Sequence, residues 1–459
     1  MRLTIMNQNI LSAFIDSSKS TGFHKLLLGV CTFVIIFSGY ELSVFGAIVP
    51  VVIREWEISP TEIGFIGSSA MFGMMFGAVL LSWMADKYGV KKMLISSIFI
   101  FNFFIVMATF TNNGFTFGLC RFMAGVGSGG ATPIVISLLT EYSPKSNKAK
   151  MVAIAICGNQ IGGMLAPLVA INVMPKFGWE PVLWLSIVPL LLIPVLIKVI
   201  PESARFLAKT NQTEKLDRIL KKIDVEYKDT QTKIERSMKG IPVEGKPSDK
   251  VSYSVLFNKK YFVGTVLITL IYICGLLTIN GVNIWLPQVM NQNGYALGSS
   301  LTFSIVLNLG TLIGTILWAA AVDKVGFRIL MPVIYIAGSI SLFCMGIRAN
   351  LIILYLFVGL IGMFAFAAHS LMNSFASQYY PGEIRTTGVG LANATGRVGG
   401  MLGPIIGGML LTANVSLTTW FLAFAIPGVI AALSMILINV HKHYINKRYM
   451  LSSEMLAKQ

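Results

Sequence analysis

The feature that most restricts what this 459-residue chain can fold into is a series of apolar runs, separated by charged residues or by Gly, Pro and Asn. Each run has about 20 residues or more, the length that an α-helix needs to cross the hydrocarbon core of a bilayer. Only 12% of the residues are charged, whereas soluble globular domains are about a quarter charged. We therefore predict an all-α membrane protein with twelve transmembrane helices. The predicted spans are 25–53, 61–84, 92–112, 114–141, 149–173, 179–199, 259–290, 298–321, 328–348, 350–378, 384–413 and 418–440.

Three further features exclude other classes of protein. The first run, Leu26 to Ile53, is too long for the h-region of a signal peptide and has no small-residue cleavage site after it, so we expect a retained span. The net charge of +16 comes from Lys and Arg in the loops between runs, which indicates membrane topology rather than nucleic-acid binding. The five cysteines lie in or at the edge of apolar runs without paired spacing, so neither a disulfide framework nor a metal site is expected.

The basic loops predict the orientation of the chain. Lys and Arg follow spans two, four, eight and ten, whereas 111–114, 291–300 and 412–419 contain none. Because positively charged loops stay in the cytoplasm, we expect a multi-pass protein of the bacterial inner (plasma) membrane with both termini inside. Segment 200–258 is rich in Lys, Asp and Glu, which predicts a cytoplasmic linker with short amphipathic helices. The expected parts are a tail at 1–24, a six-helix bundle at 25–199, this linker, a second six-helix bundle at 259–440 and a tail at 441–459.

A constant offset relates the two predicted bundles. Pro50 and Pro287 are separated by 237 residues (287 − 50). The matches at this offset involve Gly, Pro and Asp in one ungapped register, whereas chance matches in an apolar chain would involve Leu and Ile. We predict two parallel repeats about an axis along the membrane normal, with a substrate site near the midplane at their interface. The other pairs are Gly73/Gly310, Gly77/Gly314, Asp86/Asp323, Gly125/Gly362, Tyr142/Tyr379, Pro144/Pro381, and Gly162-Gly163-Met164-Leu165-x-Pro167 with Gly399-Gly400-Met401-Leu402-x-Pro404.

The offset also joins two short polar loops. One reads Asp86-Lys-Tyr-Gly89-Val-Lys91-Lys92 and the other reads Asp323-Lys-Val-Gly326-Phe-Arg328. An Asp that ends one helix, a Gly that permits a tight turn and basic residues that begin the next helix can form a charge-relay latch. A plain positive-inside turn is the alternative, and the recurrence of the loop favours the latch.

Two charged residues of the first bundle lie inside predicted spans, where charges are costly and mark functional sites. Glu41 is about 16 residues into span one, roughly 24 Å at helical rise and past the midplane. A carboxyl at that depth is costly to desolvate and is therefore a candidate proton carrier, although a permanent structural pair with an Arg is the alternative. Arg121 enters span four from the outer side, where it could bind the anion, stabilise ionised Glu41 or extend outward to the interface.

Arg397 lies about 13 residues into span eleven, roughly 20 Å deep and close to the midplane. A guanidinium at that depth must face the bundle interior, and its fork of donors is suited to bidentate capture of a carboxylate. Arg397 is therefore the leading candidate for binding an anionic substrate.

Other candidate substrate-binding residues are uncharged. His369 could hydrogen-bond or titrate, and Asn373 and Asn393 could line the cavity or bond helices to one another. Tyr40 and Trp285 could stack on an aromatic ligand, although aromatic side chains are also ordinary span residues. For His369, packing is the alternative.

No sequence signal indicates an enzyme or an ATP-driven pump. The run Gly125-Val-Gly127-Ser-Gly129-Gly130 fits G-x-G-x-x-G, but no strand precedes it and it lies within a span, so close helix packing explains it better than a dinucleotide site. There is no nucleophile–base pair, metal-ligand spacing or Walker motif in the sequence. We expect no cofactor and no bound metal.

The chain resembles the aromatic acid:proton symporter family of the major facilitator superfamily. The resemblance rests on the two latch loops, on Ser38-Gly39-Tyr40-Glu41 in span one, on Arg121-Phe with Gly125, Gly127, Gly130 and Pro133 in span four, and on Tyr380-Pro381 through Arg385, Gly388, Gly396-Arg397 and Gly403-Pro404. The tail Pro201-Glu202-Ser203-Ala-Arg205 is shared with sugar and nicotinate porters. The chain departs from the family pattern because Ser38 and Glu41 replace two Asp residues and His369 stands where a Gln is expected.

This resemblance implies a major facilitator fold and proton-coupled uptake of a small organic anion, namely an aromatic carboxylate such as a hydroxybenzoate. It also implies that Glu41 and Arg397 occupy positions important for transport. The expected partners are the organic anion, protons and the lipid bilayer, with no nucleic acid, and the expected oligomeric state is a monomer. A sugar, polyol or nicotinate porter, or an exporter of small toxic compounds, is the alternative within transport, and a non-transporting membrane sensor is the alternative outside it.

Overall fold

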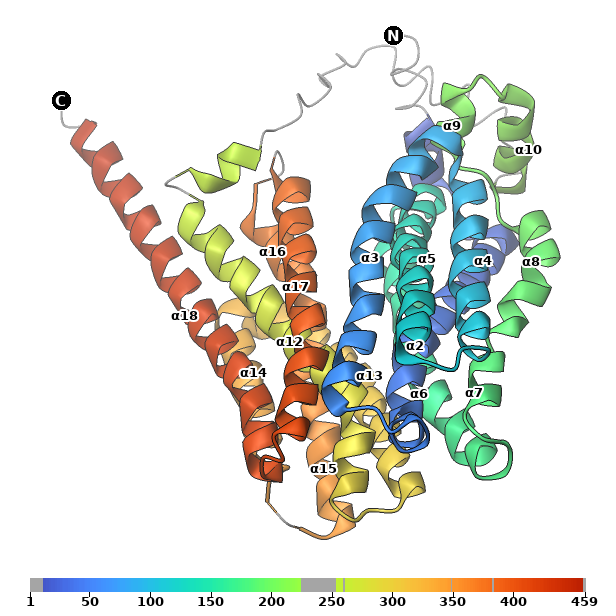
Figure 1. Cartoon of the computed structure of the whole chain (residues 1–459). Helices are drawn as coiled ribbons and strands as arrows, with labels where there is room; N and C mark the ends of the chain where they lie inside the picture. Colours follow the sequence, from blue (N-terminus) through green and yellow to red (C-terminus); the bar gives the residue numbers. More distant parts are fainter. Residues whose placement is uncertain (1–10, 224–252, 259–260, 348, 382–383, 457–459) are drawn as a thin grey trace, which may run out of the picture. The chain divides into compact units, whose positions relative to one another are not determined.

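A computed structural model describes residues 11–223, 253–258, 261–347, 349–381 and 384–456, and every regular element in these residues is helical (Figure 1). After a short helix at 11–17, the first half of the chain contains α2 (Gly22–Trp56), α3 (Pro60–Tyr88), α4 (Val90–Ala108), α5 (Gly114–Tyr142), α6 (Lys148–Phe177), α7 (Glu180–Trp184) and α8 (Ile187–Val199). The second half contains α12 (Phe262–Gln292), α13 (Leu297–Val325), α14 (Phe327–Cys344), α15 (Leu351–Ile361), the π-helix η2 (Gly362–Phe366), α16 (Ala367–Tyr379), α17 (Arg385–Thr412) and α18 (Leu417–Leu456).

Eleven helical segments in the described residues are long and apolar enough to cross a membrane. The predicted span at 384–413 corresponds to α17, which is not among these eleven although its 28 residues suffice for a crossing. Its sequence contains eight glycines together with Arg397 and Asn393, which lower its hydropathy. The prediction of an all-α membrane protein built from such spans is confirmed.

Two predicted spans are interrupted. The span at 179–199 consists of α7 and α8, which are separated at residues 185–186. The span at 350–378 consists of α15, η2 and α16, so one turn of π-helix replaces α-helix in its middle. In the predicted linker at 200–258, the described residues form α9 (Ala204–Lys209), α10 (Thr213–Ile223) and the 3₁₀-helix η1 (Tyr253–Phe257), and residues 224–252 lie outside the described part.

The 237-residue repeat also relates helix contacts. A Cβ on Gly77 would lie 1.9 Å from the carbonyl oxygen of Val126, and a Cβ on Gly314 would lie 2.3 Å from that of Met363. Both members of the second pair are 237 residues beyond those of the first. Three further pairs of contacts are related by the same offset. They are Gly73–Phe122 and Gly310–Gly359, Gly125–Ala70 and Gly362–Leu307, and Gly162–Ile36 and Gly399–Ile273. Because only Gly allows backbones to approach this closely, the repeated glycines specify the same helix packing in both halves.

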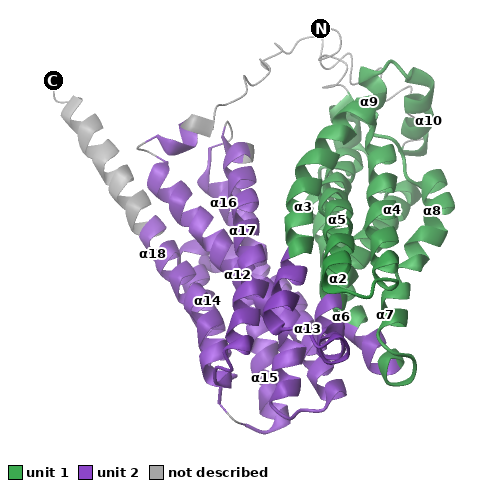
Figure 2. Ribbon diagram, viewed as in Figure 1, with its two compact units in different colours: residues 1–44, 69–166, 173–246 green, residues 45–68, 167–172, 247–459 purple. Residues whose placement is uncertain are grey.

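The chain forms two compact units (Figure 2). Unit 1 comprises Met1–Val44, Ser69–Ala166 and Val173–Lys246, and unit 2 comprises Phe45–Ser68, Pro167–Asn172 and Pro247–Gln459. The units therefore differ from the predicted six-helix bundles in the end of α2, the start of α3 and residues 167–172 within α6. The end of α2 belongs to unit 2 because it packs on α12, where a Cβ on Gly46 would lie 2.7 Å from the carbonyl oxygen of Asn283. The predicted boundaries at 199 and 259 stay a prediction.

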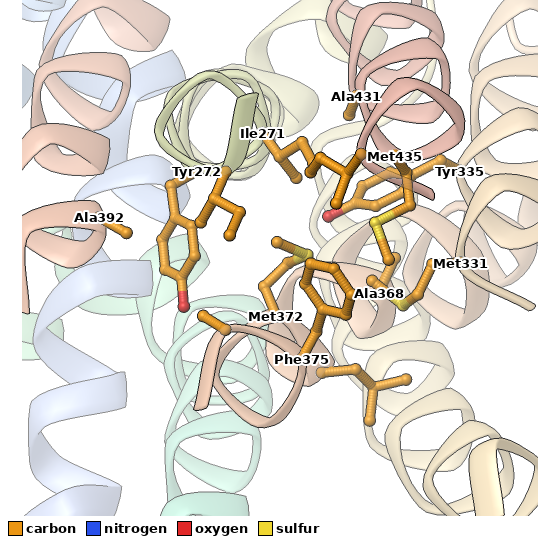
Figure 3. Packing of buried hydrophobic residues seen from close by; sticks show 14 of the residues in the cluster. Ile271, Tyr272, Met331, Tyr335, Ala368, Met372, Phe375, Ala392, Ala431 and Met435 are labelled. Carbon is orange, nitrogen blue, oxygen red and sulfur yellow. The ribbon is translucent and has the colours of Figure 1, made fainter. Parts of the chain in front are cut away.

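The core of unit 2 is an apolar cluster formed mainly by α12, α14, α16 and α18, with Val322 from α13 and Ala392 from α17 (Figure 3). Met331, Met372 and Met435 are fully buried in it. Tyr272 stands apart from these methionines, with its hydroxyl directed away from Tyr335 and Met435 (Figure 3). This position leaves the hydroxyl of Tyr272 available to polar side chains of α16, whereas the hydroxyl of Tyr335 is buried without a hydrogen-bond partner in the described residues.

Candidate functional site

Unit 1 contains a buried ion pair between α2 and α5. Arg121 Nη1 lies 3.1 Å from Glu41 Oε1 and also donates to the backbone oxygen of Glu41 at 3.2 Å. The other carboxylate oxygen, Oε2, accepts from the Ser128 hydroxyl at 3.0 Å. The side chains of Glu41 and Arg121 are 0% and 4% exposed. Arg121 therefore does not extend outward, and it neutralises the carboxylate that sequence analysis singled out.

The glycines of α5, the helix that carries Arg121 and Ser128, pack it closely against α3. A Cβ on Gly125 would lie 2.1 Å from the carbonyl oxygen of Ala70, and one on Gly129 would lie 2.3 Å from that of Met74. These residues therefore let α5 approach α3 at backbone distance. Arg121 and Ser128 are two helical turns apart on α5, so both side chains can reach Glu41.

Tyr40, next to Glu41, is 0% exposed and its hydroxyl donates to the backbone oxygen of Val182. It fastens α2 to α7. In the described structure its ring is enclosed by protein, so its observed contact is packing rather than an open surface for stacking.

Arg397 on α17, unlike Arg121, has no charged partner in the described residues. Its side chain is half-buried, and within the described residues it makes no hydrogen bond or ion pair. It occupies the position equivalent to Gln160 at the 237-residue offset. Unit 2 therefore presents an uncompensated guanidinium inside a helix that spans the membrane.

A network of polar side chains lies on the same unit as Arg397. The Tyr272 hydroxyl on α12 donates to Asn373 Oδ1 on α16 at 2.9 Å. Asn393 Nδ2 on α17 donates to the same oxygen at 2.9 Å and to the backbone oxygen of Val389 at 3.0 Å. Asn373 is exposed, Asn393 is half-buried and Tyr272 is fully buried. The structure thus brings together Asn373 and Asn393, which lie 20 residues apart in the sequence.

His369 and Trp285 are held by packing. The His369 ring makes an edge contact with Tyr272, with centroids 5.4 Å apart. Its Nδ1 is buried without a hydrogen-bond partner in the described residues and lies 2.3 Å from where a Cβ on Gly275 would be. Trp285 is 0% exposed, and its indole donates to the Pro404 oxygen at 2.8 Å.

The candidate charged residues break the internal repeat. At the 237-residue offset, Glu41 corresponds to Thr278, Arg121 to Val358 and Ser128 to Ala365. The packing glycines are conserved between the halves, whereas the charges are not. Among the residues that the structure describes, unit 1 therefore carries a neutralised pair, and Arg397 of unit 2 has no ion-pair partner.

The two predicted latch loops also differ. Gly89 and Gly326 both adopt positive φ, 106° and 82°, as the tight turn requires. Glu202 lies against the first loop: its Oε1 accepts from the backbone N–H groups of Lys91 and Ser203, each at 3.0 Å. A Cβ on Gly326, by contrast, would meet open space.

The charged latch residues lie at the surface. Asp86 is exposed and lines a cavity of about 320 Å³ with Glu141, Arg205 and Lys209. Lys92, Asp323 and Arg328 are exposed as well. In the described residues no cation lies within 4.0 Å of Asp86 or Asp323. The charge relay between these residues stays a prediction.

Sequence analysis did not identify Ser128, Tyr272 and Glu202. Ser128 could have been found because it is seven residues after Arg121 and therefore on the same helix face. Glu202 was noted only as part of a shared tail. Tyr272 carries no local signal, since a Tyr in an apolar run is ordinary and its partners come from two other helices.

Comparison with known proteins finds one family model and several transporters that match most of the chain. The family model described as Major Facilitator Superfamily matches residues 31–310 and 270–448. A benzoate transport protein of Acinetobacter baylyi is 32% identical over 95% of this chain and 93% of its own length. A 4-hydroxybenzoate transporter of Pseudomonas aeruginosa is 28% identical over 94% of this chain and 96% of its own. A gentisate transporter of Corynebacterium glutamicum is 28% identical over 90% of this chain and 87% of its own.

Among solved structures, a D-xylose–proton symporter superimposes with a TM-score of 0.71 at 20% identity, covering 91% of this chain and 97% of that one. At this identity the likeness shows the fold alone. The relatives named above are aromatic acid transporters, which agrees with the family resemblance seen in the sequence. The chain is a multi-pass membrane protein that belongs to the Major Facilitator Superfamily.

Proposed function

We propose that this protein takes up a small aromatic carboxylate, such as a hydroxybenzoate, across the bacterial inner membrane together with protons, and that both its termini are cytoplasmic. The observation that carries the proposal is the difference between the two intramembrane arginines. Arg121 is paired with Glu41 at 3.1 Å, whereas Arg397 makes no ion pair within the described residues. A cation inside a membrane-spanning helix is costly when it has no partner, so an anionic substrate that pairs with Arg397 would offset that cost.

Arg397 supplies the anion-binding group. A guanidinium binds a carboxylate through two parallel hydrogen bonds, which fix the orientation of the anion as well as its charge. The relatives that transport benzoate and 4-hydroxybenzoate act on ligands with this carboxylate. They support an aromatic acid as the substrate of this chain.

Glu41 supplies the proton-binding group. When Glu41 is ionised, Oε1 is paired with Arg121 and Oε2 accepts from Ser128. When Glu41 is protonated, the hydroxyl of Ser128 can reverse its role and accept the carboxyl proton, because a hydroxyl both donates and accepts. Protonation also removes the charge that compensates Arg121, so binding and release of the proton change the electrostatics of α2 and α5.

The two polar loops around Gly89 and Gly326 are proposed to act as latches during transport. In unit 1 the contact that supports this role is Glu202, which fixes the turn of the first loop through the backbone N–H of Lys91. Loss of this contact would free the ends of α3 and α4 from α9.

The test is uptake by purified protein in liposomes with an imposed acid-outside gradient. Wild-type protein is expected to accumulate 4-hydroxybenzoate above its external concentration. Glu41→Gln is expected to abolish gradient-driven accumulation while retaining exchange of labelled for unlabelled substrate, because Gln is permanently neutral. Arg397→Gln is expected to lose both activities, and Arg218→Gln, which removes an exposed charge outside the spans, serves as the control.

Accumulation of 4-hydroxybenzoate by Glu41→Gln at the wild-type level would refute the proton role. Retention of 4-hydroxybenzoate transport by Arg397→Gln would refute the role of Arg397 as the anion-binding group, whereas transport of a sugar or polyol instead of the acid would favour a neutral substrate. Absence of uptake of every aromatic acid tested would refute the proposed function as a whole.

A further inference from the structure

The network of Tyr272, Asn373 and Asn393 has an unusual balance of donors and acceptors. Asn373 Oδ1 accepts two hydrogen bonds, from the Tyr272 hydroxyl and from Asn393 Nδ2, each at 2.9 Å. A carbonyl oxygen has two lone pairs, so this acceptor is saturated. Because both bonds hold the same oxygen, the amide plane of Asn373 is fixed and its nitrogen is turned away from Tyr272 and Asn393.

After these bonds are formed, the two amides still have the N–H groups of Asn373 as donors and the C=O group of Asn393 as an acceptor. Asn393 Nδ2 donates to Asn373 Oδ1 and to the Val389 oxygen, and the Asn393 side chain also lies within hydrogen-bonding reach of the Tyr272 hydroxyl. In the described residues, Asn373 Nδ2 and Asn393 Oδ1 have no hydrogen-bond partner, although Asn373 is exposed and Asn393 half-buried. Two amides joined by a hydrogen bond therefore leave an N–H donor on Asn373 and a C=O acceptor on Asn393.

A phenolic hydroxyl is the complement of this arrangement. Its oxygen accepts from an amide N–H while its proton donates to an amide oxygen, so a single O–H group can use both free positions. An unsubstituted benzene ring offers neither, and it would leave both amide groups unpaired on binding, which costs free energy.

The spacing on α17 places Asn393 on the same helix face as Arg397. Asn393 and Arg397 are four residues apart and therefore on one face of the helix, with a rise of about 6 Å between them. This is similar to the separation of a carboxylate and a hydroxyl on opposite sides of one benzene ring. A hydroxyl next to the carboxylate would lie too close to Arg397 to reach the amides.

We propose that Asn373 and Asn393 recognise the ring hydroxyl of a para-hydroxylated aromatic acid whose carboxylate binds Arg397, and that Tyr272 is the positioning residue that sets the amide of Asn373. The inference rests on the proposed function, because it needs an aromatic acid at Arg397. It assigns specificity to three side chains of unit 2 that act together, one of which never touches the substrate.

The test compares uptake of 4-hydroxybenzoate, 2-hydroxybenzoate and benzoate by reconstituted wild-type protein and three variants. Tyr272→Phe removes one of the two bonds that fix Asn373, and it is expected to raise the KM for 4-hydroxybenzoate three- to tenfold, about the effect of one hydrogen bond. Asn373→Leu is expected to raise that KM more than about tenfold. For both variants the KM for benzoate and for 2-hydroxybenzoate should stay within about twofold of wild type, because these two acids do not use the amide pair.

Tyr335→Phe is the matched control. Tyr335 is 2% exposed and belongs to the same cluster as Tyr272, but its hydroxyl has no hydrogen-bond partner in the described residues. Its removal should leave the ratio of KM values unchanged, and wild-type protein should prefer 4-hydroxybenzoate to the other two acids.

The inference is overturned if Tyr272→Phe and Asn373→Leu weaken all three acids equally, which would make the network structural, or if wild type prefers benzoate. In either case uptake of aromatic acids by wild type leaves the proposed function intact. If wild type takes up none of the three acids, the proposed function fails and this inference fails with it.

Discussion

Removing one member of the Glu41–Arg121 pair should destabilise the protein more than removing both. The pair is fully enclosed, with side-chain exposures of 0% and 4%. Loss of one partner leaves the other as an uncompensated buried charge, which typically costs about 3–5 kcal/mol. We expect a loss of this size for Glu41→Gln and for Arg121→Met. The double variant leaves no buried charge and should be at least as stable as either single variant.

The loss of stability on breaking an ion pair depends on how deeply the pair is buried, and the distance between the charged atoms does not decide it. The pair between Lys148 and Asp16 is shorter, at 2.8 Å, but each of its side chains is 36% exposed. Exposed pairs contribute about 0–1 kcal/mol because water and salt screen them. Asp16→Asn is therefore the matched control, and it should change stability by less than about 1 kcal/mol even though it breaks the shorter contact.

The assay is the free energy of unfolding in mixed micelles, measured for wild type, the two single variants, the double variant and Asp16→Asn. The four proteins of the Glu41–Arg121 cycle give the coupling energy directly. If the losses of the two single variants add up in the double variant, the side chains are not coupled and the described pair does not carry the stability. If Asp16→Asn costs as much as Glu41→Gln, burial is not the controlling variable.

Two further predictions concern glycines and use the same unfolding assay. Gly89→Ala should cost more than Gly326→Ala, because both residues have positive φ but only a Cβ at Gly89 would meet another group, lying 2.6 Å from Glu202 Oε2; equal costs would mean that Glu202 moves aside freely. Gly77→Ala should strongly reduce the yield of folded protein, since its Cβ would lie 1.9 Å from the Val126 oxygen, whereas Gly390→Ala, which meets nothing within 4 Å, should stabilise α17 by about 0.5–1 kcal/mol; a normal yield of Gly77→Ala would show that α3 and α5 can separate at low cost.

The fold could be predicted from the sequence because the bilayer restricts it so strongly. Apolar length predicted the spans, and the repeated glycines predicted two equivalent halves. The structure then showed which helices these glycines bring together, as in the contact of Gly162 with the Ile36 oxygen at 1.9 Å. The interruptions were not predicted. The π-helix η2 changes the hydrogen-bond register of the backbone without changing the apolar pattern, so composition carries no sign of it.

The candidate site could be predicted only where a single residue carried the signal. Glu41, Arg121 and Arg397 stand out because a charge within a span is costly. The pairing of Arg121 with Glu41 was left open among three alternatives, because the sequence does not say which helix face opposes which. The hydrogen bonds of Tyr272 with Asn373 join helices that are 101 residues apart, and no local pattern distinguishes such a tyrosine from Tyr335, which has no hydrogen-bond partner in the described residues.

The repeat itself shows which substitutions the scaffold of unit 1 should tolerate. Unit 2 builds the equivalent helix packing with Thr278, Val358 and Ala365 at the positions of the charge cluster, and there Val358 is fully buried. Replacing Glu41, Arg121 and Ser128 with Thr, Val and Ala should therefore give a folded protein whose stability is no lower than that of Glu41→Gln. It should have lost proton-driven accumulation, because no titratable group remains at position 41. Measuring folded yield and uptake on this one variant separates the two roles of the cluster: a protein that fails to fold would show that the charges are structural, and one that still accumulates substrate against its gradient would place the proton carrier elsewhere.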